Sequence, residues 1–225
     1  MFAALLLVLA AGFGALYHGT DGFQAVTTET ARRLAIAHQA RQLPAATLQF
    51  SSGQQKLLAQ ALQADGRVTI VNFIYTRCNA ICSVMGTEFQ QLQRDLQRSG
   101  MERRVRLLSL SFDPRDQPAE LAAYARQMQA QAGVWQFAGI PEPRQRQALL
   151  DAFGITVIAA PLGEFQHNAA FHIVDAAGLL VGIVDYDAPQ AALDYALRAA
   201  QSAPAQVIAE KVAQSSQATE AGHRP

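Results

Sequence analysis

The stretch VTIVNFIYTRCNAIC, residues 68–82, joins a β-rich run to the two cysteines of this 225-residue chain. Its first eight residues are apolar with one polar interruption, which predicts a central strand covered on both faces. From 83 to 98 apolar residues recur at helical spacing, and Gly100 follows them, so a helix is predicted directly after the cysteines. Cys78 and Cys82 are therefore expected between the carboxyl end of a strand and the next helix, where open α/β sheets place their sites.

The alternation of strand and helix continues along the chain. We predict strands at 105–112 and 134–139, helices at 118–130, 143–153 and 189–200, and a β-hairpin formed by AAFHIVD (169–175) and LLVGIVD (179–185) around Gly178. Such an order requires right-handed crossovers and a mostly parallel sheet, which the closing hairpin makes mixed. The predicted fold is α/β and thioredoxin-like, with a mixed central sheet flanked by helices over residues 51–200.

The two ends differ from this domain in composition. Residues 1–20 contain sixteen successive uncharged, mostly apolar residues, 2–17, which predicts a membrane anchor or a signal segment. The run is slightly shorter than the ~20 residues of a spanning helix, and it lacks the positive start of a signal peptide, so a buried helix is a third interpretation. Residues 21–50 are expected to be a linker and N-terminal arm, and 201–225, rich in Ala, Gln and Ser, a disordered tail.

Overall composition indicates an ordinary globular protein. Half of the residues are hydrophobic, which is enough for a sizeable core in one compact domain. The formal net charge is zero and no block of Lys or Arg stands out, so nothing indicates a nucleic-acid partner.

The spacing of the cysteines leaves several kinds of chemistry open. Positions i and i+4 of a helix share one face, about 6 Å apart, so Cys78 and Cys82 could be a dithiol or a disulfide. A helix N-terminus favours a thiolate, and the neighbouring Arg77 adds positive field. Inert buried cysteines are a poor fit to this position, and a structural disulfide would close too small a loop to remove much chain entropy. Metal binding and redox chemistry remain the leading interpretations.

The metal hypothesis needs a further ligand. A structural zinc site usually takes four ligands and no second Cys pair is present, whereas copper(I) accepts two thiolates and a third soft or borderline donor. Of the five histidines, His18, His38 and His223 belong to the anchor, arm and tail. His167 is expected on a loop, where functional residues concentrate, and His172 lies in the middle of a predicted strand, where a satisfied core or surface histidine is the simpler interpretation.

Three segments together resemble a known family. They are FIYTRCNAIC (73–82), SLSFDPRDQPAELAAYA (109–125), which places Asp113 and Asp116, and HNAAFHIVDAAG (167–178). In this order they are similar to the Sco/SenC/PrrC copper proteins, thioredoxin-like assembly factors for cytochrome c oxidase. The resemblance implies that Cys78, Cys82 and His167 bind Cu(I) or Cu(II), on a domain anchored at the periplasmic face of the inner membrane or exported and soluble.

The chain departs from the family pattern near these ligands. Family members often have Pro after each cysteine and Asp between them, whereas this chain has Asn79, Ala80 and Ser83. Without the acidic neighbour the thiols should ionise more easily. Asn168 follows the histidine where Ser or Thr is common. Met85 could lend a thioether, although a core-facing methionine is the simpler expectation.

The resemblance implies a copper chaperone that delivers copper to the CuA site of the oxidase, by exchange of its ligands for those of the recipient. Its expected partners are the copper-bearing oxidase subunit, other periplasmic copper carriers, thioredoxin-like reductases and, through the anchor, the membrane. The alternative is a thiol-disulfide oxidoreductase in which Cys78 and Cys82 reduce the cysteines of that subunit, so enzymatic activity stays open. A peroxidase that uses Arg77 would leave His167 unexplained.

Overall fold

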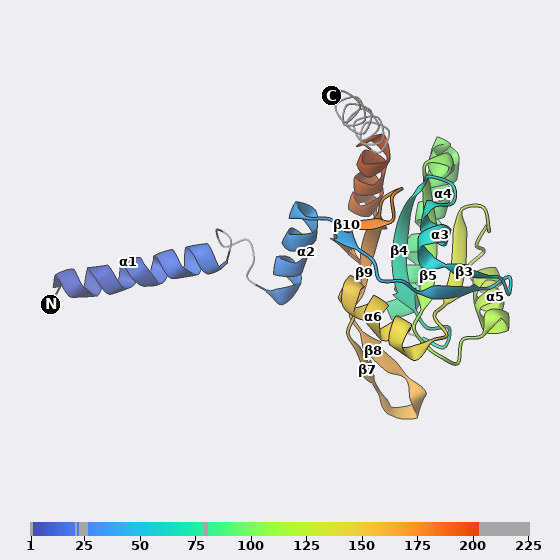
Figure 1. Cartoon of the computed structure of the whole chain (residues 1–225), viewed down its shortest axis with the longest axis horizontal. Helices are drawn as coiled ribbons and strands as arrows, with labels where there is room; N and C mark the ends of the chain where they lie inside the picture. Colours follow the sequence, from blue (N-terminus) through green and yellow to red (C-terminus); the bar gives the residue numbers. More distant parts are fainter. Residues whose placement is uncertain (1, 21, 23–26, 79–80, 203–225) are drawn as a thin grey trace, which may run out of the picture.

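The computed structural model describes residues 2–20, 22, 27–78 and 81–202, and for residues 2–4, 28 and 81–84 it describes the backbone alone. An eight-stranded mixed sheet forms the centre of the fold (Figure 1). Its strands are β1 Arg41–Gln42, β2 Thr47–Phe50, β3 Gln55–Leu57, β4 Val68–Ile74, β5 Val105–Ser111, β6 Trp135–Gly139, β9 Ala170–Val174 and β10 Leu179–Asp185. In space they follow the order β1-β10-β9-β4-β5-β6-β2-β3.

The middle of the sheet is the parallel part that the sequence predicts. β4 pairs with β5 and β5 with β6, all parallel, while β9 runs antiparallel to β4. All seven residues of β4 and of β5 are buried, as expected for central strands that helices cover on both faces. β9 and β10 form the predicted hairpin around Gly178, which has φ +86°. This mixed sheet with its flanking helices is the predicted thioredoxin-like arrangement.

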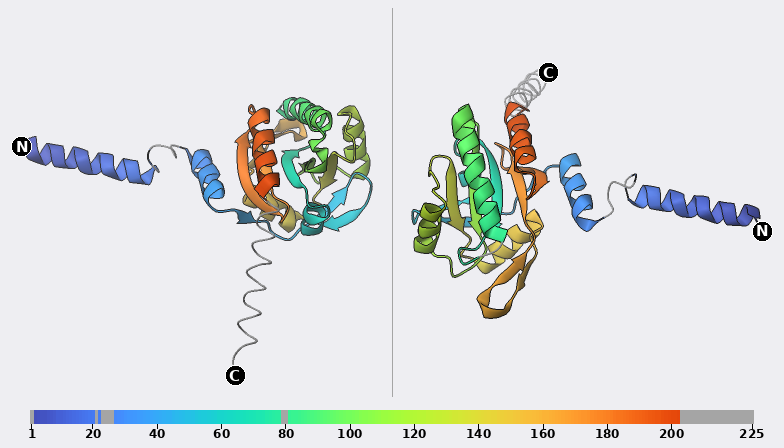
Figure 2. Two further views of the ribbon diagram at one scale, coloured as in Figure 1. Left: turned by 90° about the horizontal axis from the view of Figure 1, so that it is seen from above. Right: turned by 180° about the vertical axis from the view of Figure 1, so that it is seen from behind.

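The helices are α1 Phe2–Gly19, α2 Thr28–His38, α3 Leu58–Gln63, α4 Ile81–Ser99, α5 Pro118–Gln127 and α6 Pro143–Phe153, followed by a C-terminal helix that continues from 189 to the last described residue, 202. α4 and the C-terminal helix lie on one face of the sheet, and α6 lies on the other (Figures 1 and 2). α5 and α6 each begin with a proline in the first turn, where its missing N–H costs nothing.

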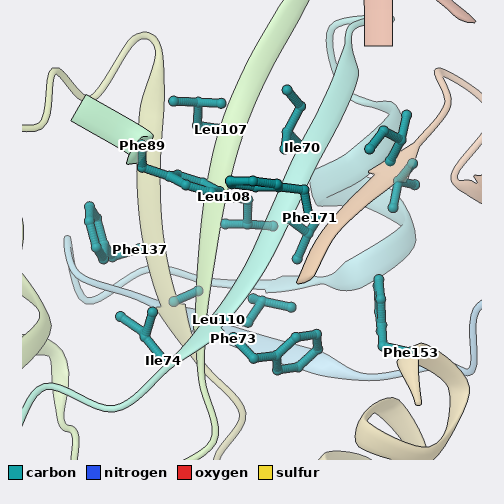
Figure 3. Close-up of a cluster of buried hydrophobic side chains, with 14 of the residues drawn as sticks. Ile70, Phe73, Ile74, Phe89, Leu107, Leu108, Leu110, Phe137, Phe153 and Phe171 are labelled. Atoms are coloured by element: carbon teal, nitrogen blue, oxygen red, sulfur yellow. The ribbon is translucent and has the colours of Figure 1, made fainter. Parts of the chain in front are cut away.

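The core therefore has two layers, one on each face of the sheet. On the α4 face, Phe89 stacks on Phe171 with ring centroids 5.8 Å apart (Figure 3). On the opposite face, Phe153 of α6 contacts Phe73 of β4, with 5.1 Å between centroids. Successive residues of a strand point to opposite faces, so Phe171 enters the first layer and His172 the second.

The N-terminal part of the chain supplies two helices. α1 exposes large apolar side chains along its length, including Leu6, Leu7 and Val8. Within the described ranges, none of the helices combines the length and the apolarity needed to cross a bilayer. α2 packs against β10, with Ile36 buried and Arg33 paired with Asp185. The arm expected over 21–50 thus contributes α2, β1 and β2, while the expected tail beyond residue 202 lies outside the described residues.

A second, two-stranded sheet corrects the expectation for His167. β7 (Val157–Ala159) and β8 (Phe165–His167) pair antiparallel, so His167 ends a strand instead of lying on a loop. Figures 1 and 2 show this hairpin projecting beyond the main sheet. Its strands have three residues each and are only partly buried, which is too little for a recognisable alternating pattern.

The turn of this hairpin places a leucine, Leu162, in a conformation with positive φ. Leu162 (φ 62°, ψ 19°) and Gly163 (φ 76°) both have positive φ, and the Glu164 N–H donates to the Pro161 carbonyl at 3.3 Å. These are the features of a type I′ turn, which normally favours Asn or Gly at its first central position. Leu162 is fully exposed there.

Candidate metal centre

The first candidate ligands lie on the connection between β4 and α4. Cys78 is buried, with 6% of its surface exposed, and its N–H donates to the Tyr75 carbonyl at 3.2 Å. The backbone of Cys82 lies in the first turn of α4, as the sequence predicts. The side chain of Cys82 lies outside the described part of the chain, as do Asn79 and Ala80.

A buried carboxylate holds the turn that leads to Cys78. Asp116 accepts the Thr76 N–H at 2.8 Å, the Thr76 hydroxyl at 2.6 Å and the Ser111 hydroxyl at 2.6 Å. These three bonds connect the ends of β4 and β5 to the loop before α5. Asp116, which the sequence marks only as part of a motif, therefore fixes the backbone two residues before Cys78.

His167 approaches the same region from β8. Its ring lies 5.0 Å from that of Phe112 and 6.3 Å from that of Tyr75, centroid to centroid. Its Nδ1 is 2.9 Å from the Asn168 carbonyl oxygen. A carbonyl can only accept, so Nδ1 carries the proton and Nε2 keeps the lone pair with which a histidine binds a metal.

The surroundings also keep His167 neutral. Burial lowers the pKa of His167, and the Asn168 carbonyl and nearby Cys78 offset this only in part. A histidine with a lowered pKa is uncharged at neutral pH, and the uncharged imidazole is the form that coordinates metal ions. The Cys78 N–H donates to the Tyr75 carbonyl and the ring of His167 contacts that of Tyr75, so the two candidate ligands adjoin the same residue.

Tyr75 lies between the cysteine turn and the hairpin. Its hydroxyl donates to Glu164 Oε2 at 2.7 Å and accepts the Phe165 N–H at 3.4 Å. Burial raises the pKa of Tyr75, and Glu164 and Cys78 raise it further, so the phenol stays protonated. Tyr75 is thus affected by Cys78 on one side and contacts the ring of His167 on the other.

A second buried carboxylate, Asp113, pairs with the arginines near the candidate ligands. The side chain of Asp113 is fully buried and pairs with Arg115 at 2.7 Å and with Arg77 at 3.3 Å. Burial opposes ionisation of Asp113, but the hydrogen bonds and charges of the two arginines outweigh it, and the pKa of Asp113 is lowered. Arg77 was expected to add positive field to the cysteines, and it shares Asp113 with Arg115, so two positive charges face one negative charge here.

The remaining candidates have structural surroundings. His172 is fully buried between Phe73 and Phe153, as expected for a core histidine, and Met85 is buried in the core as well. Asn168, the departure after the histidine, accepts the Thr156 N–H at 2.7 Å and donates to the Gly154 carbonyl at 2.9 Å. It therefore ties the base of the hairpin to the end of α6.

The described donors suit a soft metal. No group of three His, Cys, Asp or Glu residues able to hold a metal ion exists among the described side chains, which do not include Cys82. A sulfur from Cys78 and a neutral imidazole nitrogen from His167 are donors that copper(I) accepts. Tyr75 and Arg115 lie within two of the segments that carry the resemblance, but their contacts with Glu164 and Gly163, far away in the chain, have no signal in the sequence.

Comparisons with known proteins point to one family. The family model SCO1/SenC matches residues 39–201. A curated relative, the SCO1 protein homolog of Bacillus subtilis (strain 168), is 30% identical over 113 residues, which are 48% of this chain and 57% of that protein. The chain thus aligns with little more than half the length of this relative.

Solved structures share the fold. Bradyrhizobium japonicum ScoI with copper bound has a TM-score of 0.58 and 19% identity, covering 70% of this chain and 98% of that one. BsSco, a member of the Sco family of cytochrome c oxidase assembly proteins in which a disulfide switch was identified, has a TM-score of 0.59 and 24% identity, covering 72% of this chain and 95% of that one.

Proposed function

This chain belongs to the SCO1/SenC family, and from that premise we propose that it binds copper through Cys78, Cys82 and His167 and delivers it during assembly of cytochrome c oxidase. The observation that carries the proposal is the approach of His167 to the cysteine turn, with Nδ1 protonated and bonded to the Asn168 carbonyl, so that Nε2 carries the lone pair. The copper-bound relative and the oxidase-assembly relative support the same cargo and recipient.

The proposed chemistry is ligand exchange. Two thiolates and an imidazole bind Cu(I) tightly, because these are soft and borderline donors. Three ligands leave the ion open to attack by a thiolate of a recipient, so copper can pass to the CuA site with no change in oxidation state. Copper is then the cargo of the protein, and the chain returns to its metal-free form after each transfer.

The test is the copper content and affinity of the full chain. Cys78→Ser, Cys82→Ser and His167→Ala should each weaken copper binding by about 10-fold or more, since each removes one of three ligands. His38→Ala is the matched control, because His38 is exposed on α2. Full affinity and an unchanged Cu(II) spectrum in His167→Ala would refute the three-ligand site.

A second function, thiol-disulfide exchange, is favoured by the position of Cys82 in the first turn of α4, where a helix N-terminus stabilises thiolates. One thiolate would attack a disulfide of the oxidase subunit, giving a mixed disulfide and releasing one thiolate of the target. The other would attack the mixed disulfide at the sulfur of this chain and release the second thiolate of the target. The products are a reduced target and a Cys78–Cys82 disulfide, so two electrons pass to the target. A reduction potential far below that of any periplasmic donor, with no turnover on a disulfide target, would exclude this function.

The proposed location is the periplasmic side of the inner membrane. The support for export is α1, whose large apolar side chains are exposed to solvent in the isolated chain. A fusion of residues 1–26 to an alkaline phosphatase, which needs an oxidising compartment, tests export. Activity in the periplasm is expected, and a cytoplasmic, inactive fusion would contradict it.

A further inference from the structure

We propose that Arg115 is a positioning residue that holds the β7–β8 hairpin, and His167 with it, at a set distance from the turn that carries Cys78. The inference deepens the proposed copper function and rests on it for the role of His167. Arg115 touches neither candidate ligand, so it would act through the two segments that carry them.

One end of the Arg115 side chain reaches the hairpin. Its Nη2 donates to the Gly163 carbonyl at 2.7 Å, and its guanidinium carbon lies 5.4 Å from the centroid of the Phe165 ring. Phe165 begins β8 and His167 ends it. Arg115 therefore contacts both the turn of the hairpin and the strand that presents the histidine.

The same guanidinium is fixed on the cysteine side. Its Nε donates to Asp113 Oδ1 at 2.9 Å and its Nη2 donates to Oδ2 at 2.7 Å. Asp113 is fully buried and also pairs with Arg77, the residue before Cys78. The chain of contacts from the hairpin through Arg115, Asp113 and Arg77 thus ends next to the first candidate ligand.

The turn of the hairpin is shaped to receive this side chain. A Cβ atom at Gly163 would lie 2.8 Å from Nη1 of Arg115, closer than real Cβ contacts allow. Glycine at this position therefore allows both the positive φ of 76° and the close approach of the guanidinium. A side chain here would push Arg115 away from the carbonyl that it binds.

The hairpin depends on such contacts because β7 and β8 pair with each other and not with the eight-stranded sheet. Three side-chain ties to the rest of the domain stand out among the described residues: Tyr75 to Glu164, Asn168 to Gly154, and Arg115 to Gly163. A ligand that is held by packing and hydrogen bonds of its supporting residues keeps the geometry of its site. Arg115 is 42% exposed at its side chain, so its replacement removes no core packing.

The experiment compares the full chain with Arg115→Met, Arg115→Lys and the control Arg98→Met. Methionine keeps the length of the side chain without its charge or donors, and lysine keeps the charge without the planar fork. Arg98 is 71% exposed near the end of α4 that is remote from the cysteines. The first readout needs no metal: backbone hydrogen exchange of residues 157–167 compared with β4 and β5. The second is the affinity and spectrum of the Cu(II) complex.

In Arg115→Met we expect the rate of backbone hydrogen exchange in residues 157–167 to rise about tenfold or more, with the rates in β4 and β5 unchanged. The copper affinity should fall about 10- to 100-fold, and the Cu(II) spectrum should change. Arg115→Lys should resemble Arg115→Met, and Arg98→Met the unsubstituted chain. Unchanged exchange in Arg115→Met would overturn the inference, as would faster exchange with unchanged copper affinity and spectrum. Failure of the copper function itself would appear differently, as an unsubstituted chain that binds no copper.

Discussion

Replacing His172 with leucine should remove a large part of the acid sensitivity of this fold. His172 is fully buried, with its ring 5.9 Å from that of Phe73 and 5.2 Å from that of Phe153, and neither ring nitrogen has a hydrogen-bond partner among the described atoms. Burial lowers its pKa to about 3 and the charge of Arg32 adds to this, while the backbone of Val71 and Phe153 and the charge of Glu29 oppose it.

The sign of the effect follows from proton linkage. In the unfolded chain His172 has an ordinary pKa of about 6.5, so the unfolded state takes up the proton before the folded state does. Stability is therefore complete above pH 6.5 and is lost as the pH falls toward the folded pKa of about 3. Between pH 7 and pH 5 the expected loss is about 2 kcal/mol in the free energy of unfolding.

Urea unfolding at pH 7 and pH 5 measures this loss. The unsubstituted chain should lose about 2 kcal/mol more than His172→Leu over this interval. At pH 7 the variant should be as stable or more so, since it removes two unsatisfied polar atoms from the core. His38→Leu, at an exposed position on α2, should keep the original pH dependence. Equal pH dependence in the chain and in His172→Leu would refute the reasoning.

Three further substitutions test other parts of the structure. Asp116→Ala leaves three hydrogen-bond donors in a buried region without their acceptor. It should lower the free energy of unfolding in urea by about 3 kcal/mol, and a loss under 1 kcal/mol would contradict the role of this carboxylate. Leu162→Asn suits the type I′ turn and should stabilise the chain by about 1 kcal/mol in thermal unfolding, whereas a lower midpoint would argue against the strained leucine. Gly182→Ala places a Cβ 2.7 Å from the ring of Tyr195, whose hydroxyl is hydrogen-bonded to the Val181 carbonyl. It should lower the free energy of unfolding in urea by about 1–3 kcal/mol, and unchanged stability would show that the ring can move.

Local patterns in the sequence predicted the main architecture. The β-rich runs at 68–74 and 105–111 are buried parallel strands, and Gly178 closes the predicted hairpin of β9 and β10. The short strands before β4 and the β7–β8 hairpin were missed, because strands of two to four residues show too few alternations to reveal a period. The place of His172 within a strand indicated a structural residue, in the core or at the surface, and the packing of α6 decided for the core.

Cys78, Cys82 and His167 could be selected from the sequence because of their residue types, their spacing and the resemblance of three segments to one family. Which groups surround them was decided by the tertiary structure alone. Tyr75 meets Glu164, and Arg115 meets Gly163, across 89 and 48 positions of the chain. A hydrogen bond between such distant residues depends on how the strands and loops pack, and no period or local preference of the sequence encodes it.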